Sequence, residues 1–328
     1  MKILVTGATG YLGRAVVAAA AARGHSPVAF ARTASAAGLP AVPYDGDVRD
    51  EDAVLAAAAG CDAICHLAAL VSVWRPRRAD FDEVNIGGLR AVLRAAARLD
   101  IKRVVYTSSF MALAPAGAAT PVMLNDYQRT KVLADRVAAE AVAAGAPLIR
   151  LYPSVIYGAG LLRESNLIGV MITDHLAGRL PGLVGAARRW SYAYIDDVAD
   201  GHLAALERGE AGERYLLGGD NVPQMRIFEI VRDLTGARLP RRIPFAAALA
   251  FAACSEARAA LTGAAPRLTI GTARILNRDW TMPSDEASRR LGFRVTAIRD
   301  GLARVVAAVG DRRVSAATGP AGDRRTRE

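Results

Sequence analysis

A glycine-spaced run near the N-terminus constrains the fold of this chain more than any other feature. The run Gly7-Ala8-Thr9-Gly10-Tyr11-Leu12-Gly13 follows the apolar residues Ile3-Leu4-Val5 and precedes an alanine-rich segment. Glycines at this spacing let a strand turn tightly into a helix and let the backbone approach a pyrophosphate, whose charge then faces the positive end of the helix dipole. This context favours a dinucleotide-binding loop over a bare β-turn. The expected contacts are Gly7, Thr9, Gly10, Tyr11, Leu12 and Gly13.

Short apolar runs alternate with alanine-rich runs through the first half of the chain. This alternation predicts βαβ units, and therefore an α/β fold with a doubly wound parallel sheet of six or seven strands. After Gly158 the alternation weakens, and segments rich in Gly, Pro and Arg imply a smaller C-terminal lobe. Strands are expected at residues 3–5, 28–30, 63–67, 104–107 and 148–152, and helices at residues 12–23, 51–59, 81–99 and 127–144.

The expected domain organisation follows from this change of pattern. Residues 1–158 form the cofactor-binding domain, and residues from about 190 to 220 cross back to it. Residues 159–310 form mainly the substrate-binding lobe. The tail, residues 311–328, is small, polar and charged, which predicts disorder.

Composition argues against several other classes of protein. At 328 residues and 52% hydrophobic content, the chain can bury a large core. Its net charge of +10 comes from scattered arginines, and no basic stripe interleaves with aromatic residues, so no nucleic acid partner is expected. Three cysteines and four unclustered histidines favour neither a disulfide framework nor a metal site. This cysteine usage fits a reducing cytoplasm.

Two segments bear on location. Because the first expected strand begins at Lys2, no signal peptide is expected ahead of the fold. Residues 243–254 are apolar, but Ser255, Glu256 and Arg258 interrupt the run before it reaches the length that spans a bilayer. The sequence therefore favours a buried or partly exposed helix over a membrane-touching segment, and a cytoplasmic protein without stable membrane insertion.

The end of the second expected strand carries the signal for cofactor choice. An acidic residue there hydrogen-bonds the ribose hydroxyl of NAD and excludes a phosphate. Here the strand ends Phe30-Ala31-Arg32. Because a guanidinium pairs with a 2′-phosphate and stacks on adenine, Arg32 favours NADP. An exposed arginine without that role would leave NAD acceptable.

Two further strand ends are expected to meet the cofactor, since ligands of open α/β sheets collect at carboxyl ends. Asp47-Val48 follows Gly46, and Asp47 is placed to accept a hydrogen bond from the adenine amine. Leu67-Ala68-Ala69 ends the fourth strand, where the small alanines leave room for the cofactor. His66 precedes this turn, and we expect it to be a packed histidine rather than a catalyst.

Tyr127 and Lys131 form the second constellation. Residues four apart share one face of a helix, so both side chains can point into the same cleft. A phenol titrates near a pH of about 10. An adjacent ammonium and the positive charge of an oxidised nicotinamide would favour phenolate, which makes Tyr127 usable as an acid or base near neutral pH. Lys131 is also expected to hold the nicotinamide ribose. The preceding strand ends Thr107-Ser108-Ser109, whose serines can hydrogen-bond a substrate oxygen.

With these residues, nearly the whole chain resembles the extended short-chain dehydrogenase/reductase family, part of the NAD-dependent epimerase/dehydratase superfamily. It resembles the dihydroflavonol reductase and 3β-hydroxysteroid dehydrogenase branch, and most closely the plant-type farnesol dehydrogenases. The runs that carry the resemblance are Ala68-Ala69-Leu70-Val71 with Trp74, Tyr106-Thr107-Ser108-Ser109-Phe110, Leu151-Tyr152-Pro153-Ser154-Val155-Ile156-Tyr157-Gly158, Asp196-Asp197-Val198 with Gly201-His202, and Gly212-Glu213-Arg214-Tyr215-Leu216-Leu217.

The resemblance implies a Rossmann fold with a smaller substrate-binding lobe, and it assigns roles residue by residue. Ser109 is the substrate-side hydroxyl, with Ser108 as the alternative, Tyr127 is the acid/base, and Lys131 is its partner. Asn85 lies behind the cofactor. Asp196-Asp197 begins a structural segment that ties the lobes together. A homodimer is left open. The resemblance further implies cofactor contacts from Thr107, Ser108, Tyr127, Lys131, Tyr152, Pro153, Ser154 and Val155.

The segment between Ser109 and Tyr127 bears on the substrate. Sugar-nucleotide epimerases of this fold usually follow the serines with Val-Tyr-Gly, whereas this chain reads Phe110-Met111-Ala112-Leu113-Ala114. Its apolar residues, Met111, Leu113, Val122, Met123 and Leu124, suit an apolar substrate, although they are equally compatible with ordinary core packing.

The sequence thus predicts an oxidoreductase that transfers a hydride between NAD(P) and an alcohol or ketone of a hydrophobic substrate, such as a prenyl alcohol or a steroid-like or flavonoid-like ketone. The alternative enzyme is a nucleotide-sugar epimerase or dehydratase that retains its NAD. A cofactor-binding regulator without catalysis is the alternative from another class, and the presence of Ser109, Tyr127 and Lys131 argues against it.

Overall fold

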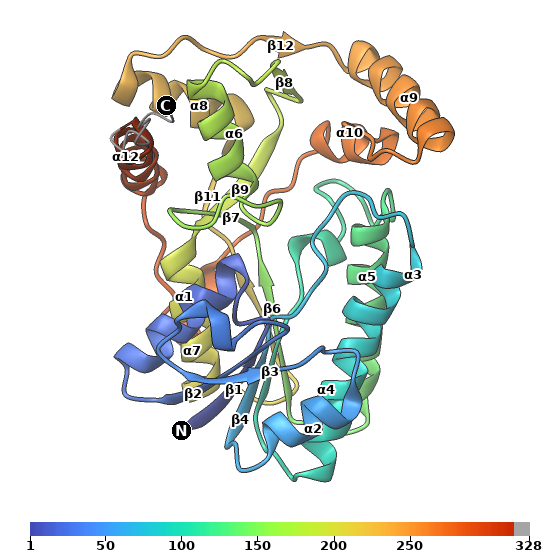
Figure 1. Ribbon diagram of the computed structural model, residues 1–328, viewed down its shortest axis with the longest axis vertical. Helices are drawn as coiled ribbons and strands as arrows, with labels where there is room; N and C mark the ends of the chain where they lie inside the picture. The colour runs from blue at the N-terminus through green and yellow to red at the C-terminus, as the bar shows by residue number, and fades with distance from the viewer. Residues whose placement is uncertain (318–328) are drawn as a thin grey trace, which may run out of the picture.

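Seven parallel strands form the centre of one half of the molecule, the lower half in Figure 1. The computed structural model describes residues 1–317, and residues 311–317 by their backbone alone. The strand order β10-β6-β5-β4-β1-β2-β3 reverses direction between β1 and β4, which confirms the predicted doubly wound sheet. The strands are β1 Lys2–Thr6, β2 Ser26–Ala31, β3 Val42–Asp45, β4 Ala63–His66, β5 Val104–Thr107, β6 Leu148–Pro153 and β10 Arg214–Leu217.

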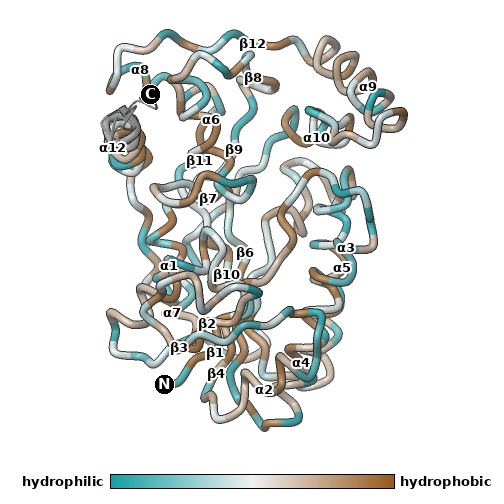
Figure 2. Tube along the Cα trace, viewed as in Figure 1, coloured by the Kyte–Doolittle hydropathy of each residue, from teal (hydrophilic) through white to brown (hydrophobic). Residues whose placement is uncertain are grey.

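Helices cover both faces of this sheet and bury its apolar strands, which Figure 2 colours brown. One face carries α1, α7 and α11, and small residues such as Ala20 and Ala205 let these helices pack closely. The other face carries α2, α4 and α5. The helices are α1 Tyr11–Ala22, α2 Glu51–Ala58, α4 Gly88–Arg98, α5 Asp126–Ala143, α7 Ile195–Arg208 and α11 Asp285–Leu291.

The helix expected over residues 81–99 contains an interruption. α3 (Ala79–Asp82) passes into a π-helical turn, η2 (Glu83–Gly87), before α4 begins. The turn contains Asn85, which is 3% exposed and is hydrogen-bonded to residues on two other segments. π-Helical turns inside α-helices are frequent at functional sites. The hydrogen bonds that Asn85 makes to two other segments therefore give a physical reason for the interruption.

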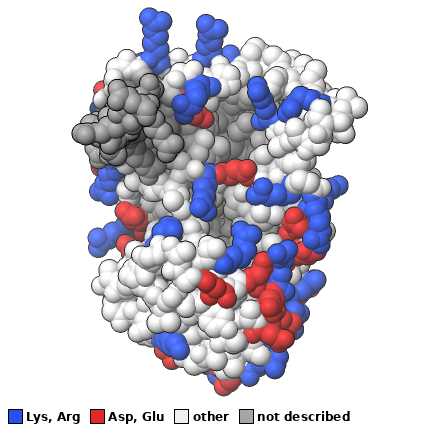
Figure 3. Space-filling model, viewed as in Figure 1, with Lys and Arg blue, Asp and Glu red and all other residues white. Residues whose placement is uncertain are grey.

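The second lobe, uppermost in Figure 1, surrounds an aromatic core that includes Trp190, Tyr192, Phe228 and Trp280. The surface is hollowed between this lobe and the sheet, and basic side chains border the hollow (Figure 3). The strands of the lobe are β7 Val155–Tyr157, β8 Leu183–Val184, β9 Arg189–Tyr194, β11 Asp220–Pro223 and β12 Arg242–Ile243. Its helices are α6 Leu167–Leu176, α8 Gln224–Thr235, α9 Phe245–Thr262, α10 Ile270–Leu276 and α12 Ile298–Ala317, and two short 3-10 turns, η1 Ser35–Ala37 and η3 Phe110–Ala112, lie in the first half of the chain.

The chain crosses between the two halves more than once. β9 belongs to a three-stranded sheet of the upper lobe, whereas β10 pairs with β6 at the edge of the large sheet. At the C-terminus, α12 continues to Ala317, so the backbone of residues 311–317 is helical where a disordered tail was expected. The rest of that expected tail lies outside the described residues.

Asp197 ties the start of α7 to the segment that precedes α12. Its carboxylate accepts hydrogen bonds from the backbone N–H of Thr296 at 2.6 Å and from the Thr296 hydroxyl at 2.9 Å. Asp196, its neighbour, is exposed. The resemblance treated the two acids alike as structural, and the hydrogen bonds distinguish them.

We therefore expect Asp197→Ala to lower the free energy of unfolding by about 2 kcal/mol, because it removes a charged acceptor of two hydrogen bonds. The loss is measured as a lower urea midpoint at unchanged slope. Asp196→Ala is the matched control, and its effect should stay within about 0.5 kcal/mol. Equal losses in the two variants would contradict the structural role of Asp197.

Candidate active site

The glycine loop lies where β1 and β4 diverge. Gly7 has a φ of +70°, and a Cβ there would lie 2.8 Å from the backbone of Ala68 in the loop after β4. A Cβ on Gly13 would lie 2.1 Å from the carbonyl oxygen of Gly7. Only glycine fits these two positions, so the first turn of α1 packs directly against the loop.

The N-terminus of α1 is suited to an anion. Gly10, the N-cap residue, has no side chain to accept a hydrogen bond, and the first turn contains no acidic residue. The N–H groups and the positive dipole end are therefore available to a phosphate. The Tyr11 side chain is not, because it is buried and its hydroxyl donates to the carbonyl of Gly158 at 3.0 Å. Thr9 and Leu12 are partly exposed beside it. This backbone cradle fits the pyrophosphate of a dinucleotide.

Arg32 directly follows β2 and is exposed. Asp47 lies near it, but Arg49 holds the Asp47 carboxylate with bonds of 3.0 and 2.7 Å and lowers its pKa. The adenine amine would therefore have to share Asp47 with Arg49. Val48 is 7% exposed and packs against Gly88 rather than facing solvent.

The loop after β4 is held against β1. The backbone N–H of Ala68 donates to the Thr6 hydroxyl at 3.2 Å, and Leu67 and Ala69 flank it, partly exposed. His66 is 1% exposed, and its Nδ1 lies 2.7 Å from the same hydroxyl. Burial and the charge of Lys131 lower the pKa of His66 to about 3, so this histidine is neutral and packed, as expected.

The two candidate serines have different partners. The Ser108 hydroxyl donates to Asp135 at 3.2 Å, away from the tyrosine. The Ser109 side chain accepts from the N–H of Met111 at 3.2 Å, and its hydroxyl lowers the pKa of Tyr127, against the larger effect of burial. Burial raises the pKa of Tyr127 on balance. Ser109 is therefore the serine that the fold brings to Tyr127.

Lys131 is 4% exposed, one turn after Tyr127 on α5. Its ammonium donates to the carbonyl of Thr107 at 3.1 Å. Burial lowers the pKa of Lys131 to about 8, whereas the Asp135 carboxylate, one turn further along, raises it. Tyr127, Lys131 and Asp135 thus follow one another along a single face of α5. Among the residues that the structure describes, no set of His, Cys, Asp and Glu is placed to hold a metal ion.

The end of β6 continues the site from Asp135. The Tyr152 hydroxyl donates to Asp135 at 2.6 Å. Pro153 closes the strand, and Ser154 follows it with a buried hydroxyl that has no hydrogen-bond partner among residues 1–317. Val155, 7% exposed, begins β7. A buried hydroxyl without a partner fits the polar edge of a nicotinamide, which the resemblance places here.

Two buried side chains hold this arrangement from behind. Asn85 accepts from the N–H of Leu70 at 2.7 Å and donates to the Thr130 hydroxyl at 2.9 Å, which joins the loop after β4 to α5. The Nδ1 of His202 lies 2.7 Å from the Val198 carbonyl and must donate a hydrogen bond to it. Its Nε2 therefore accepts a hydrogen bond from the Thr107 hydroxyl, at 2.9 Å.

Two residues near the site escaped the sequence reasoning. Asp135 is the next residue on the Tyr127 and Lys131 face, so the spacing of four could have found it. Arg14 follows the third glycine of the loop and donates to the Ala37 carbonyl at 3.3 Å, in the turn after Arg32. Its Nε is buried without a partner in the described chain. Because Arg14 directly follows the glycine loop, the sequence could have indicated it as a cation close to the cofactor phosphates.

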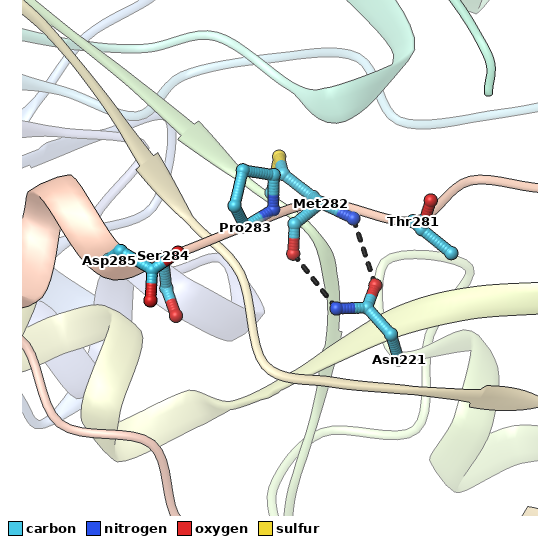
Figure 4. Close-up of a pocket in the computed structure, with 6 residues that line it drawn as sticks. All are labelled: Asn221, Thr281, Met282, Pro283, Ser284 and Asp285. Atoms are coloured by element: carbon cyan, nitrogen blue, oxygen red, sulfur yellow. Dashed lines mark hydrogen bonds between the residues drawn. The ribbon is translucent and has the colours of Figure 1, made fainter. Parts of the chain in front are cut away.

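A pocket of about 400 Å³ lies outside this site. It is lined by Asn221 and residues 281–285, none of them predicted site residues (Figure 4). The Asn221 amide donates to the carbonyl of Met282 and accepts from its N–H, at 3.1 and 2.9 Å. These bonds fasten an extended segment to β11, which explains the asparagine structurally.

The geometry defines a nucleotide-binding α/β enzyme with its reactive side chains at the carboxyl edge of a Rossmann sheet. The chain belongs to the NAD dependent epimerase/dehydratase family, the extended short-chain dehydrogenases, whose family model matches residues 3–218. The names of its relatives support the predicted reductase and 3β-hydroxysteroid dehydrogenase branch.

Two curated relatives match nearly the full chain. The sterol demethylase protein B of Methylococcus capsulatus is 32% identical, with 94% of this chain and 98% of the relative covered. The 4-hydroxy-2-methyl-3-oxo-4-farnesyl-3,4-dihydroquinoline-1-oxide ketoreductase of Stigmatella aurantiaca is 32% identical, with 89% and 92% covered.

Solved structures agree on the fold. The crystal structure of gox2253 is 30% identical with a TM-score of 0.79, covering 94% of this chain and 98% of that one. The UDP-glucose 4-epimerase of Thermotoga maritima has a TM-score of 0.77 at 20% identity, covering 95% and 99%. At that identity the second likeness concerns the fold alone.

The pKa of Lys131 leads to a pH prediction. With a pKa of about 8, the ammonium is present below pH 8 and is lost as the pH rises through that value. A reaction that needs the charged lysine therefore declines above about pH 8. Asp135→Asn removes a carboxylate that raises the lysine pKa, so the alkaline limb of kcat/KM should move to lower pH.

Tyr152→Phe is the matched control, because it removes a hydrogen bond to Asp135 and leaves the charge. Its alkaline limb should move less than that of Asp135→Asn. A limb unmoved in Asp135→Asn would show that the carboxylate does not control the lysine.

Proposed function

We propose that this chain is an oxidoreductase that transfers a hydride between NAD(P) and an alcohol or ketone of a hydrophobic substrate. The observation that carries the proposal is the surroundings of Tyr127. Phe110, Val122 and Leu124 are partly buried and, like Tyr127 itself, pack against the aromatic core of the upper lobe, where the ring centroids of Phe110 and Trp280 are 5.5 Å apart. Such walls bind an apolar body and leave Ser109 and Tyr127 as the polar groups for one oxygen.

The chemistry of the chain's own residues follows from their contacts. In oxidation, Tyr127 as phenolate takes the proton of the substrate alcohol, and in reduction it returns that proton to the developing alkoxide. Ser109 donates a hydrogen bond to the same oxygen and keeps it beside the phenol. Lys131 supplies a buried positive charge one turn away, which favours phenolate. A nicotinamide held in this site would supply or accept the hydride.

Burial raises the pKa of Tyr127 in the protein alone, although the sequence predicted an acidified phenol. The expected acidification depends on charge that arrives with an oxidised cofactor, in addition to Lys131. The site is therefore proposed to become competent only when the cofactor is bound. The glycine cradle, Lys131 and the Ser154 hydroxyl are the residues that would hold it.

The names of the relatives support an apolar substrate class. One acts by name on a farnesyl quinoline oxide, one is named for sterol demethylation, and one is a 3β-hydroxysteroid dehydrogenase/isomerase. For this chain we propose a prenyl, steroid-like or flavonoid-like alcohol or ketone, with farnesol dehydrogenase-like specificity as one member of that set.

Tyr127→Phe tests the mechanism. The variant should bind NAD(P) with unchanged affinity and lose several orders of magnitude in turnover, because it keeps the ring and removes the proton donor. Turnover is followed by cofactor absorbance with a panel of prenyl, steroid and flavonoid-type alcohols and ketones. Tyr44→Phe on β3 is the control and should leave turnover unchanged.

Two outcomes would overturn this proposal. Undiminished turnover in Tyr127→Phe would exclude the proton-transfer role. Absence of cofactor consumption across the panel, with NAD found retained in the purified protein, would favour a nucleotide-sugar epimerase or dehydratase.

Arg32 is proposed to select NADP, with Arg14 nearby as a second cation. Arg32→Ala should weaken NADP binding by roughly 10- to 100-fold and leave NAD binding nearly unchanged, because a charge-assisted pair with a phosphate contributes about 1.5–3 kcal/mol. Arg98→Ala, at the far end of α4, is the matched control. Titration of both cofactors by fluorescence measures the change, and an equal effect on NAD and NADP would exclude selection by Arg32.

A further inference from the structure

Helix α9 lies at the rim of the upper lobe (Figure 1), and most of its residues are exposed. Its composition would allow it to cross a membrane by length and hydropathy, yet it packs by one side on the lobe and only 17% of it is buried. The partly exposed helix expected from the sequence is therefore present. Figure 2 shows it mostly in white to brown tones.

The side of α9 that faces the lobe contains polar groups as well as alanines, and the exposed side is largely apolar. The Ser255 hydroxyl accepts from the N–H of Arg267, and the Glu256 carboxylate accepts from the N–H of Ile270, both at 2.8 Å and both toward the lobe. Phe251 is 52% exposed and Leu261 is 88% exposed. A surface helix normally turns several charged side chains to water, whereas on α9 only Arg258 is both charged and exposed. The exposed residues of the helix, called here the outer face, are apolar except for Arg258 and Thr262, and they are Ala246, Ala247, Ala250, Phe251, Ala253, Cys254, Ala257, Arg258, Ala260, Leu261 and Thr262.

Basic side chains occur on α9 itself, on the segments before and after it, and on α10. Residues 236–276 contain six arginines and one acid, Glu256, which is turned inward. All six arginines are exposed, and none forms an ion pair within the described part of the chain. Figure 3 shows basic side chains along this end of the molecule. The arginines are Arg238, Arg241, Arg242, Arg258, Arg267 and Arg274.

We propose that the outer face of α9 binds the surface of an anionic phospholipid bilayer, with the arginines on the headgroups. An apolar helix face bordered by unpaired arginines has the composition of a helix that lies in a membrane interface. The charge is complementary to anionic lipid, which is enriched in the cytoplasmic leaflet. This contact is peripheral, since the other side of α9 remains packed on the lobe.

One helix, α10, separates α9 from the segment that leads to Tyr127. α9 packs on α10, where a Cβ on Gly271 would lie 1.9 Å from the carbonyl oxygen of Leu124. Leu124 precedes Tyr127 by three residues, and Met123 beside it is 42% exposed. If the substrate is hydrophobic, as the proposed function holds, it can pass from the bilayer toward Tyr127 along apolar side chains.

Flotation with lipid vesicles tests the membrane contact on the full chain. The protein should float with vesicles of equal parts phosphatidylcholine and phosphatidylglycerol, and not with phosphatidylcholine alone. Phe251→Glu with Leu261→Glu should lower binding about tenfold or more, because charged side chains replace the buried apolar area. Arg242→Gln with Arg267→Gln should do the same, at about 1 kcal/mol per arginine, and high salt should reproduce the loss.

Matched double variants elsewhere on the surface control for nonspecific effects. Val42→Glu with Leu99→Glu, and Arg90→Gln with Arg136→Gln, change exposed residues of the same kinds away from α9 and should leave flotation unchanged. Circular dichroism confirms that each variant is folded.

Three outcomes would overturn the proposal. The first is absence of binding to anionic vesicles, and the second is an equal loss in the control variants. The third is a dimer by light scattering that the Phe251 and Leu261 variants dissociate without any change in vesicle binding, which would make α9 a contact between two copies. Because flotation uses no substrate, its failure is distinct from failure of the proposed enzyme activity.

Discussion

Close contact between two loop backbones is the constraint on which the site depends. Gly7 touches the backbone of Ala68, and Gly13 brings the first turn of α1 against Gly7, so the loops after β1 and β4 meet without intervening side chains. This contact leaves α1 pointing its uncapped N-terminus into the crevice where the strand order reverses. The phosphate cradle is therefore a property of backbone packing, and side chains add selectivity at its edges.

The reactive groups are set on the neighbouring strands by burial as much as by partners. Burial lowers the pKa of Lys131 and raises that of Tyr127. Both shifts favour the neutral side chains, whereas the proposed reaction requires an ammonium and a phenolate. Asp135 partly offsets the shift by raising the pKa of the lysine, and Ser109 does so by lowering the pKa of the tyrosine. Because the interior disfavours the charged forms, the positive charge of a bound oxidised cofactor would have a large effect on the pKa of the tyrosine.

The sequence predicted the architecture well because its signals are local. The strands after the glycine loop are short apolar runs between helical patterns, and β5 begins and ends at the residues expected. The reactive face of α5 followed from a spacing of four. What the sequence could not decide depends on contacts between distant segments. Ser108 and Ser109 are adjacent, and they differ in their partners on α5, which are Asp135 for Ser108 and Tyr127 for Ser109.

The same reason explains the other differences. Asp47 was expected to face adenine, but whether Arg49 holds its carboxylate depends on the turn after β3. The orientation of α9 escaped prediction because an alanine-rich helix has little periodic contrast, and the inward direction of Glu256 is set by a chain segment 14 residues further on. Both features depend on tertiary contacts, which a short stretch of sequence does not specify.

The π-turn at Asn85 has a consequence for how this helix can vary in length. Phe81 before it and Leu89 after it are both fully buried, so the turn absorbs one surplus residue between two fixed anchors. Shortening the turn to an ordinary α-helix would rotate one anchor by about 100° about the axis. It would also withdraw the amide that joins Leu70 to Thr130. An irregularity that looks dispensable in a ribbon drawing thus sets the phase of a whole helix.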